Sequence, residues 1–351
     1  EEQLEDTEYQ LMRLKMEGTP TITEWLGKEL QDVQSPEVGL DGMVNSYNYV
    51  KDLSYSLRKL GGITLRTNLD PLEQIWENRP SLPANPVEIQ PLEYAGETLA
   101  SKVVRIRKSL RELHADGMLV SALDDIAWTL NLRGTDVHCN PVFVSYLLIE
   151  SDKVSLFVDD NKLSPEVKQY LQDNQVSLYN YNKVEKCLES YSEYNILLDG
   201  DETSYYLWKT VKCQEIVAAA SPIPAMKAVK NKAEIEGYRS AMLKDGVAMV
   251  KFLKWLKPAV EAGGQTEISI DEKLTSLRAE QKLFRDISFD TIAGYAQHGA
   301  IVHYEATPET DVVLKPEGLI LIDSGAQYQD GTTDITRTIA LGAVSAEMKH
   351  I

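Results

Sequence analysis

The chain has 351 residues, of which 43% are hydrophobic, and its 54 acidic and 36 basic residues give a net charge of −18 at pH 7. This length exceeds the roughly 250–300 residues at which a single hydrophobic core stops growing, so we expect two or three domains. The acidic balance excludes nucleic acid and anionic membrane surfaces as expected partners, because both repel a negatively charged protein.

The sequence shows no secretory or membrane-spanning signal, and together with its cysteine content this predicts a cytoplasmic protein. No apolar run approaches the roughly 18–20 residues that span a bilayer, and the opening segment, EEQLEDTEYQ, is too acidic for a secretory signal. Cys139, Cys187 and Cys213 are an odd number without metal-ligand spacing, which predicts free buried thiols in a reducing compartment. The chain does not begin with Met, and its last residues, AEMKHI, look like the first turn of a helix, so we expect a chain cut at both ends.

Two proline-containing segments divide the sequence into three parts. Four prolines fall in the fourteen residues of NRPSLPANPVEIQP, Asn78 to Pro91, where they remove backbone donors and favour an extended linker. A second boundary falls near SPIPAMK, Ser221 to Lys227, just before a long helical pattern. We therefore predict domains over residues 1–83, 84–221 and 222–351.

The middle part alternates helix and strand, which predicts a mixed sheet covered by helices. A helix is expected between Gly96 and Gly117, where apolar residues recur at helical spacing. These residues are Leu99, Val103, Ile106, Leu110 and Leu113. MLVSAL then predicts a buried strand, DDIAWTLNL a short helix capped by Asp124, and FVSYLLIESDKVSLFVDD two strands around a tight turn.

One short segment occurs twice. LDGMVNSY, from Leu40 to Tyr47, recurs as LDGDETSY, from Leu198 to Tyr205, with five matches in eight positions. Both copies follow an apolar strand and precede a helix. We infer that the second domain repeats the fold of the first, of which the chain holds only the later portion.

The third part begins with two helical patterns and ends in strands. The first helix, in KAVKNKAEIEGYRSAMLKDGVAMVKFLKWL, is expected to bury one apolar face. That face comprises Ile235, Tyr238, Met242, Val247, Val250, Leu253 and Leu256. ISIDEKLTSLRAEQKL predicts a second amphipathic helix, and FDTIAGYAQHGAIVHY predicts strands that meet a loop.

Two aspartates flank the hairpin expected in LILIDSGAQYQDGTTDITRTIAL. Asp323 ends an apolar strand, and Asp334 follows eleven residues later, behind the hairpin-turn signal Asp330-Gly331. A strict two-residue turn at that signal would place Asp323 opposite Thr338, about 13 Å along the strand from the partner of Asp334. We therefore expect a bulge or wide loop between Ala326 and Thr333 that brings the two acids nearly opposite each other.

Facing carboxylates repel each other and lose hydration, so they need a proton, a cationic side chain or a metal. In the alternative without a metal, Asp323 bonds backbone groups around Ser324-Gly325 and Asp334 caps the turn, an arrangement that chance favours for an arbitrary pair at this spacing. His303 lies twenty residues before Asp323, where a strand is expected to meet a polar loop, and is the candidate catalytic residue. His298 is the weaker candidate because no strand fixes it.

The run from Ser288 to Gly342, with SFDTIAGYAQHGAIVHYEATPETD and LIDSGAQYQDGTTDITRTIALG, resembles the metal-binding core of the cytosolic-type aminopeptidase P family, in the creatinase/prolidase pita-bread superfamily. The resemblance extends upstream through LDPLEQIWENRP, ALDDIAWTLNLRGTDVHCNPVFVSYLLI and AVKNKAEIEGYR. It implies α/β and α+β architecture: two creatinase-type α/β domains, the first of them partial, followed by the first half of a pita-bread catalytic domain.

The resemblance also implies an aminopeptidase with two divalent metal ions, usually Mn²⁺, acting on peptides with proline in second place. Asp323 and Asp334 match two of the family's five metal ligands, and His303 matches the residue that contacts substrate and stabilises the tetrahedral intermediate. A hydroxide that bridges the two ions would be the nucleophile. A homodimer is expected from the family as well.

The other three family ligands are expected downstream of Asp334, as a histidine in an HGTGHG-like loop and two later glutamates. Only seventeen residues follow Asp334, and none of the five histidines in the sequence lies in such a motif. Two carboxylates alone hold Mn²⁺ weakly, so the chain by itself is expected to be inactive.

Two other functions are alternatives to the peptidase. Some pita-bread domains bind protein segments without metal, so a non-catalytic protein-binding module is the second hypothesis. Retention of Asp323, Asp334 and His303 favours the enzyme, because a binding role needs none of them. A prolidase-type dipeptidase is disfavoured because the double α/β arrangement resembles aminopeptidase P.

Overall fold

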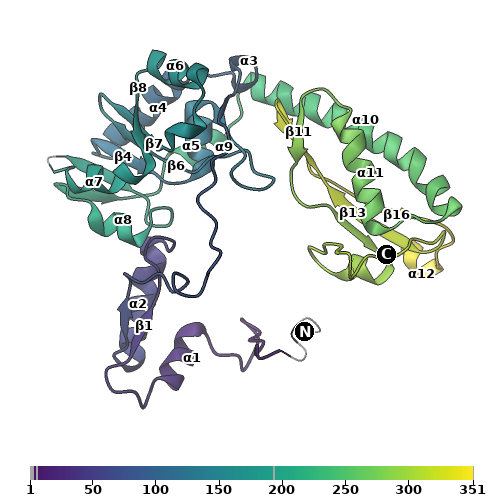
Figure 1. Cartoon of the computed structure of the whole chain (residues 1–351), viewed down its shortest axis with the longest axis horizontal. Coiled ribbons are helices and arrows are strands. Elements are labelled where there is room, and N and C mark those ends of the chain that lie inside the picture. Colours follow the sequence, from purple (N-terminus) through teal and green to yellow (C-terminus); the bar gives the residue numbers. More distant parts are fainter. Residues whose placement is uncertain (1–3, 5–6, 193, 351) are drawn as a thin grey trace.

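The computed structural model describes residues 4, 7–192 and 194–350, which form three parts (Figure 1). The first part contains α1 (Ile22–Glu29), β1 (Glu37–Gly39), α2 (Tyr47–Gly61) and β2 (Thr64–Arg66), and its two strands pair in parallel. Residues 79–86 have no regular secondary structure and lead to the second part, which confirms the predicted linker for these residues. The end of the predicted segment differs, because Val87 bridges Leu163 and Glu88–Ile89 form a strand of the second part.

The second part is built on a six-stranded sheet in the order β10-β9-β4-β6-β7-β8. The strands are β4 (Gly117–Val120), β6 (Ser145–Glu150), β7 (Val154–Val158), β8 (Val176–Asn180), β9 (Asn195–Leu198) and β10 (Glu215–Ala218). The helices are α3 (Leu92–Ala95), α4 (Leu99–Glu112), α5 (Leu123–Leu130), α6 (Pro165–Asp173), α7 (Val184–Glu189), α8 (Tyr205–Thr210) and α9 (Ile223–Ala228). A short pair, β3 (Glu88–Ile89) and β5 (Leu132–Arg133), lies apart from this sheet.

Both faces of this sheet are covered, as the alternation along β4 shows. Met118 and Val120 belong to a core with residues of α4, α5 and α6, whereas Leu119 belongs to a second core with residues of α7 and α8. The β4-β6 and β6-β7 pairs are antiparallel and the other neighbours are parallel. The predicted mixed sheet covered by helices is confirmed.

One local detail of the second part was predicted wrongly. Asp124 does not cap its helix, because the residue in the cap position of α5 is Ala122 and makes no side-chain cap bond. Asp124 lies inside the first turn instead and forms an ion pair with Lys227 of α9. The three cysteines are free thiols as predicted, although each is half-buried rather than buried.

The repeated LDG…SY segments have the same local structure. In each copy a strand, β1 or β9, leads into a helix, α2 or α8, that the serine of the motif caps. The copies also bond each other reciprocally: Tyr47 N donates to Thr203 O at 3.0 Å, and Tyr205 N donates to Asn45 O at 2.8 Å. The strand-then-helix prediction is confirmed for both copies, which meet where the first part contacts the second.

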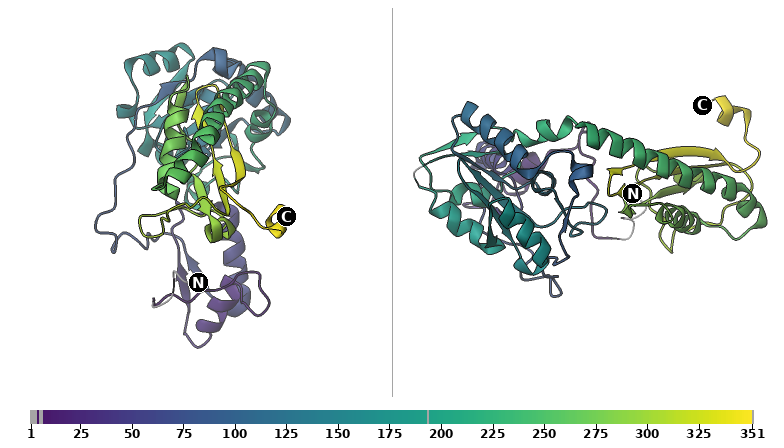
Figure 2. Two further views of the ribbon diagram at one scale, coloured as in Figure 1. Left: turned by 90° about the vertical axis from the view of Figure 1, so that its right-hand side faces the viewer. Right: turned by 90° about the horizontal axis from the view of Figure 1, so that it is seen from above.

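The third part packs two helices against two small sheets. Helices α10 (Lys232–Ala262) and α11 (Glu267–Ala279) run along one side of the strands (Figures 1 and 2). The sheets have the orders β12-β13-β16 and β11-β14-β15. The strands are β11 (Phe284–Ile287), β12 (Ile292–Tyr295), β13 (Leu319–Ser324), β14 (Ala326–Tyr328), β15 (Gly331–Thr332) and β16 (Ile335–Ala340), and α12 (Ala346–His350) follows them. Among the described residues, no helix combines the length and the apolar character needed to cross a membrane.

The face that α10 buries differs from the predicted one. Ile235, Tyr238, Met242, Val247 and Val250 were expected inside, but they are 40–66% exposed. Of the predicted set, Leu256 is fully buried and Leu253 packs against the core. The buried residues of α10 are Gly237, Ala241, Asp245, Ala248, Met249, Phe252, Leu256 and Val260. Hydrophobicity does not identify this face because it includes Gly, Ala and an ion-paired Asp.

The hairpin turn lies one residue before the Asp330-Gly331 signal. Tyr328 pairs with Gly331, which leaves Gln329 and Asp330 as the two loop residues. Strands β13 and β16 continue in the same register, with no residue inserted on either side. The bulge or wide loop predicted between Ala326 and Thr333 is therefore wrong, and the earlier turn is what brings the two acids closer together.

Contacts with α10 fix this turn. Lys244 donates to both carboxylate oxygens of Asp330, at 2.6 and 2.8 Å, and Asp330 is only 8% exposed. Gly237 lies so close to the Asp330 carbonyl oxygen that a Cβ at this position would overlap it. At Gly331, a Cβ would lie 3.2 Å from Tyr238 Cα. The packing of α10 on the loop therefore selects the turn that is observed.

Replacement of Gly237 by Ala tests this contact. Ala is favoured over Gly inside a helix by about 1 kcal/mol, so a neutral site would gain stability. We expect Gly237→Ala instead to lower the free energy of unfolding by about 1–3 kcal/mol, because the methyl group overlaps the Asp330 carbonyl. Urea unfolding followed by circular dichroism measures the change.

The matched control for Gly237→Ala is Gly246→Ala, in the same helix. A Cβ at Gly246 would meet no heavy atom within 4 Å, so this substitution should raise stability or leave it unchanged. Equal stabilisation by both substitutions would show that α10 does not hold the turn.

Candidate metal centre

Asp323 and Asp334 are diagonal neighbours across the β13-β16 ladder. Asp323 pairs with Thr336, and Asp334 lies two residues before that partner, so the two side chains lie on the same face. Diagonal residues in an antiparallel pair have Cα atoms roughly 7–8 Å apart and side chains that can meet. The sequence-predicted pair is brought together, although the two acids are not directly opposite each other.

Both aspartates line a cavity of about 470 Å³ that His303 lines as well. The other lining residues are Phe289, Asp290, Ile292, Tyr304 and Glu305. The structure therefore gathers all three sequence-predicted site residues around one space.

Two negatively charged carboxylates this close together repel each other unless a proton or a cation lies between them. Burial, then the charge of Asp323, then a hydrogen bond shared with it raise the pKa of Asp334 above its ordinary value. Asp323 Oδ1 is buried and has no hydrogen-bond partner among the described residues. Two adjacent carboxylates with an unpaired oxygen form a donor set that suits a hard divalent cation. The alternative in which backbone groups satisfy Asp323 does not account for that oxygen.

A break in the ladder accompanies the pair of acids. A Cβ at Gly325, the residue opposite Asp334, would overlap the Thr333 carbonyl oxygen and the Ser288 hydroxyl. That carbonyl accepts from Ser288 Oγ at 2.8 Å, while Ala326 N donates to Thr333 Oγ1 at 3.0 Å. Thr333 N still donates to Ala326 O at 2.9 Å. Only glycine fits at position 325 because the Thr333 carbonyl oxygen and the Ser288 hydroxyl occupy the space of a side chain.

His303 lies in a turn, not at the end of a strand as predicted. Strand β12 ends at Tyr295 and is followed by the short 3₁₀ helix η4 (Ala296–Ala300). His303 comes three residues later, is exposed, and has a left-handed φ of 57°. A residue in such a loop needs support from outside the loop to hold its position.

Glu267, the first residue of α11, supplies that support. Its carboxylate is fully buried and accepts a hydrogen bond from Tyr295 N at 2.7 Å and from the Tyr304 hydroxyl at 2.8 Å. It also bonds His298 Nδ1 at 3.0 Å. Because His303 lies between His298 and Tyr304 in the sequence, these bonds fix the segment on both sides of it.

Sequence reasoning missed Glu267 and misjudged what fixes His298. No strand holds His298, as expected, but the buried carboxylate of Glu267 does, and His298 is not among the residues that line the cavity. The acid follows Thr266, which caps α11, and acids are common in the first turn of any helix. Nothing in the local sequence distinguishes this acid from an exposed one.

Residues 78–234 match the creatinase/prolidase N-terminal domain, and residues 236–351 match metallopeptidase family M24. A creatinase-type α/β domain followed by part of an M24 pita-bread domain is therefore the class of protein that this fold and site define. The two matches meet near the start of α10, while the domain bounds 1–83, 84–221 and 222–351 stay a prediction.

Two curated relatives show which family within this class the chain belongs to. The chain is 35% identical to the Xaa-Pro aminopeptidase ApepP of Drosophila melanogaster over 96% of its length, and 34% identical to aminopeptidase P2 of Arabidopsis thaliana over 97%. It belongs to the Xaa-Pro aminopeptidase P family. It spans about half the length of these curated relatives, 56% and 52% respectively.

Solved structures agree with this assignment. The X-prolyl aminopeptidase of Caenorhabditis elegans, described as a cytosolic enzyme with a di-nuclear active site, has a TM-score of 0.88 and 27% identity. The comparison covers 96% of this chain and 56% of that one. The Xaa-Pro dipeptidase of Bacillus anthracis, with a TM-score of 0.58 and 19% identity over 72% of this chain and 68% of that one, shares the fold alone.

Truncation of Glu267 tests its supporting role. We expect Glu267→Ala to lower the free energy of unfolding by about 2–4 kcal/mol, because it leaves buried hydrogen-bond donors without an acceptor. Thermal unfolding measures the loss. Glu272→Ala, at an exposed position in the same helix, is the control and should be nearly neutral. Equal effects of the two substitutions would rule out this role for Glu267.

The raised pKa of Asp334 predicts how pH affects the metal-free protein. The native state holds this proton more tightly than the unfolded chain, so the stabilising contribution is present at low pH and is lost as pH rises through the raised pKa. At neutral pH in chelator, Asp334→Asn should therefore raise the melting temperature slightly, since Asp334 is exposed and the repulsion is screened. The difference should shrink below pH 4. A variant that is less stable than wild type at pH 7 would contradict this.

Proposed function

We propose that this protein acts as a metal-dependent Xaa-Pro aminopeptidase, which hydrolyses the first peptide bond of peptides with proline in second place. The observation that carries the proposal is the pairing of Asp323 with Asp334 in a cavity that they share with His303. The names of the Drosophila, Arabidopsis and Caenorhabditis relatives support the same activity.

Asp323 and Asp334 would hold two divalent metal ions, for which we propose Mn²⁺ because carboxylate oxygens suit hard cations. Such ions, when bound, lower the pKa of water and polarise a carbonyl group. The unpaired Oδ1 of Asp323 gives one free donor, and the carboxylate of Asp334, which lines the same cavity, gives a second. The M24 relatives are longer than this chain, and further ligands are expected from the part that it does not cover.

His303 would bind the substrate in the cavity that it lines together with the two carboxylates. Its imidazole can donate a hydrogen bond to the carbonyl oxygen of the scissile bond, which strengthens as negative charge develops on that oxygen. Glu267 holds the surrounding loop in place through the bonds described above. Apolar walls at Phe289 and Ile292 can receive a proline ring, whose imide nitrogen carries no proton to recognise.

The proposal predicts that Asp334→Asn removes both metal and turnover. We expect kcat/KM for an Xaa-Pro peptide to fall by at least about 100-fold, because a neutral amide is a poor ligand for Mn²⁺. Metal content after dialysis and peptide hydrolysis, measured on the protein with all its domains, check the two expectations. Glu272→Gln is the control, at an exposed site outside the cavity.

Unchanged metal content and unchanged turnover in Asp334→Asn would contradict the assignment of Asp334 as a metal ligand. Absence of both metal and peptidase activity in the wild-type protein would favour the alternative, a non-catalytic protein-binding module. An Xaa-Ala peptide tested beside the Xaa-Pro peptide distinguishes a proline-selective enzyme from a general aminopeptidase.

We also propose a cytoplasmic homodimer. The Caenorhabditis relative is described as cytosolic, and the likeness to it supports the same location here. Dimerisation is an expectation from the family resemblance, and sedimentation of the purified protein would measure it.

A further inference from the structure

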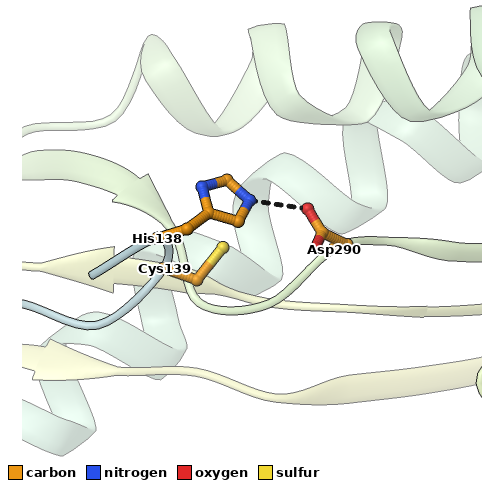
Figure 3. A group of neighbouring side chains, drawn as sticks. All are labelled: His138, Cys139 and Asp290. Carbon is orange, nitrogen blue, oxygen red and sulfur yellow. Dashed lines mark hydrogen bonds and ion pairs between the residues drawn. The ribbon is translucent and has the colours of Figure 1, made fainter. Parts of the chain in front are cut away.

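A second group of metal-binding side chains lies beside the candidate site. His138 and Cys139 belong to the loop between β5 and β6 of the second part, and Asp290 lies between β11 and β12 of the third. One donor atom from each residue lies within 4.8 Å of the other two (Figure 3). We propose that His138, Cys139 and Asp290 form a binding site for a cation of the zinc class, which would join the second α/β domain to the pita-bread domain.

The donor types favour a cation different from the one proposed for Asp323 and Asp334. A thiolate and an imidazole select Zn²⁺ or Co²⁺ over Mn²⁺ and Mg²⁺, which prefer oxygen alone. Three protein donors leave the fourth tetrahedral position for water, as in many zinc sites. The two groups therefore need not compete for the same ion.

The geometry needs only a small adjustment to hold such an ion. Ligand atoms around a tetrahedral zinc ion are about 3.3–3.8 Å apart, given bond lengths of about 2.0–2.3 Å. His138 Nε2 and Asp290 Oδ1 are 2.8 Å apart, and the largest separation in the group is within 4.8 Å. The side chains of His138 and Asp290 are 68% and 53% exposed, so they can move by about 1 Å without repacking a core.

The backbone of the site is held more firmly than its side chains. The carbonyl oxygen of Cys139 accepts a hydrogen bond from Gln327 Nε2, in β14, at 3.0 Å. Asn140 N donates to Val137 O at 3.1 Å within the same loop. The third part of the chain therefore already fixes the loop in the position from which Cys139 can reach Asp290.

The surrounding charge attracts a cation. Asp290 and Asp286 raise the pKa of both His138 and Cys139, and Glu305 adds to the effect on His138. Burial contributes most to the shift of the thiol, whose pKa rises to about 11. A divalent cation would displace the proton and use the same negative charges.

Cobalt absorption tests the proposal directly. Co²⁺ added to chelator-treated protein should give one equivalent of a near-ultraviolet charge-transfer band from a sulfur ligand. The band should disappear in Cys139→Ser, and the affinity should fall at least tenfold in His138→Gln. Cys187→Ser and Cys213→Ser are the controls and should retain it. A wild-type protein without the band, or Cys139→Ser with it, would overturn the proposal.

Two further measurements separate this site from the aspartate pair. The double variant Asp323→Asn, Asp334→Asn should keep the cobalt band whether or not the proposed peptidase site is correct. Zn²⁺ should slow alkylation of Cys139 by a maleimide at least tenfold, with Cys187 and Cys213 unaffected, as read by peptide mass spectrometry. Loss of the band in the double variant, or equal alkylation with and without Zn²⁺, would show that no such site exists.

Discussion

The position of the two aspartates depends on the contact between α10 and the Gln329–Asp330 turn. In a hairpin the turn sets the register of the whole ladder, and moving it by one residue shifts every pair by two positions. A turn one residue later would separate Asp323 from the partner of Asp334 by about 13 Å. The Lys244–Asp330 ion pair and the close approach of Gly237 favour the earlier turn, so helix packing decides whether the two carboxylates share a cavity.

Two aspartates of the third part form ion pairs with cationic side chains, whereas, among the residues that the structure describes, the two aspartates of the candidate site do not. Asp245 is fully buried but bonded to the equally buried Arg278, and Asp330 is paired with Lys244. Asp323 and Asp334 are diagonal neighbours on one face of the ladder, and no cationic side chain forms an ion pair with either one within the described residues. Adjacent carboxylates without a cationic partner are destabilising, and a proton or a bound cation relieves their repulsion. The paired aspartates hold the scaffold, and the unpaired ones are available for binding.

The helices and strands of the fold could be predicted from the sequence. The long-range contacts that decide the position of the turn and the buried face of α10 could not. The strand that contains Asp323, the hairpin after it and the mixed sheet of the second part follow from local patterns of apolar and turn residues. The exact turn did not follow, because an Asp-Gly signal is local whereas the contact with α10 spans more than 80 residues of sequence. The buried face of α10 and the role of Glu267 were missed for the same reason: Gly237 and Glu267 gain their importance only from what packs against them.

The second α/β domain also takes part in placing the site. Gln90, from that domain, donates through Nε2 to the carbonyl oxygen of Gln329 in the turn at 2.7 Å, and Gln327 in β14 bonds the Cys139 carbonyl oxygen. The β14-β15 hairpin is therefore held by α10 on one side and by the second domain on another. Displacement of that domain would loosen the turn that sets the register of Asp323. The second domain therefore contacts the β14-β15 hairpin directly, through the side chain of Gln90 and the backbone of Cys139.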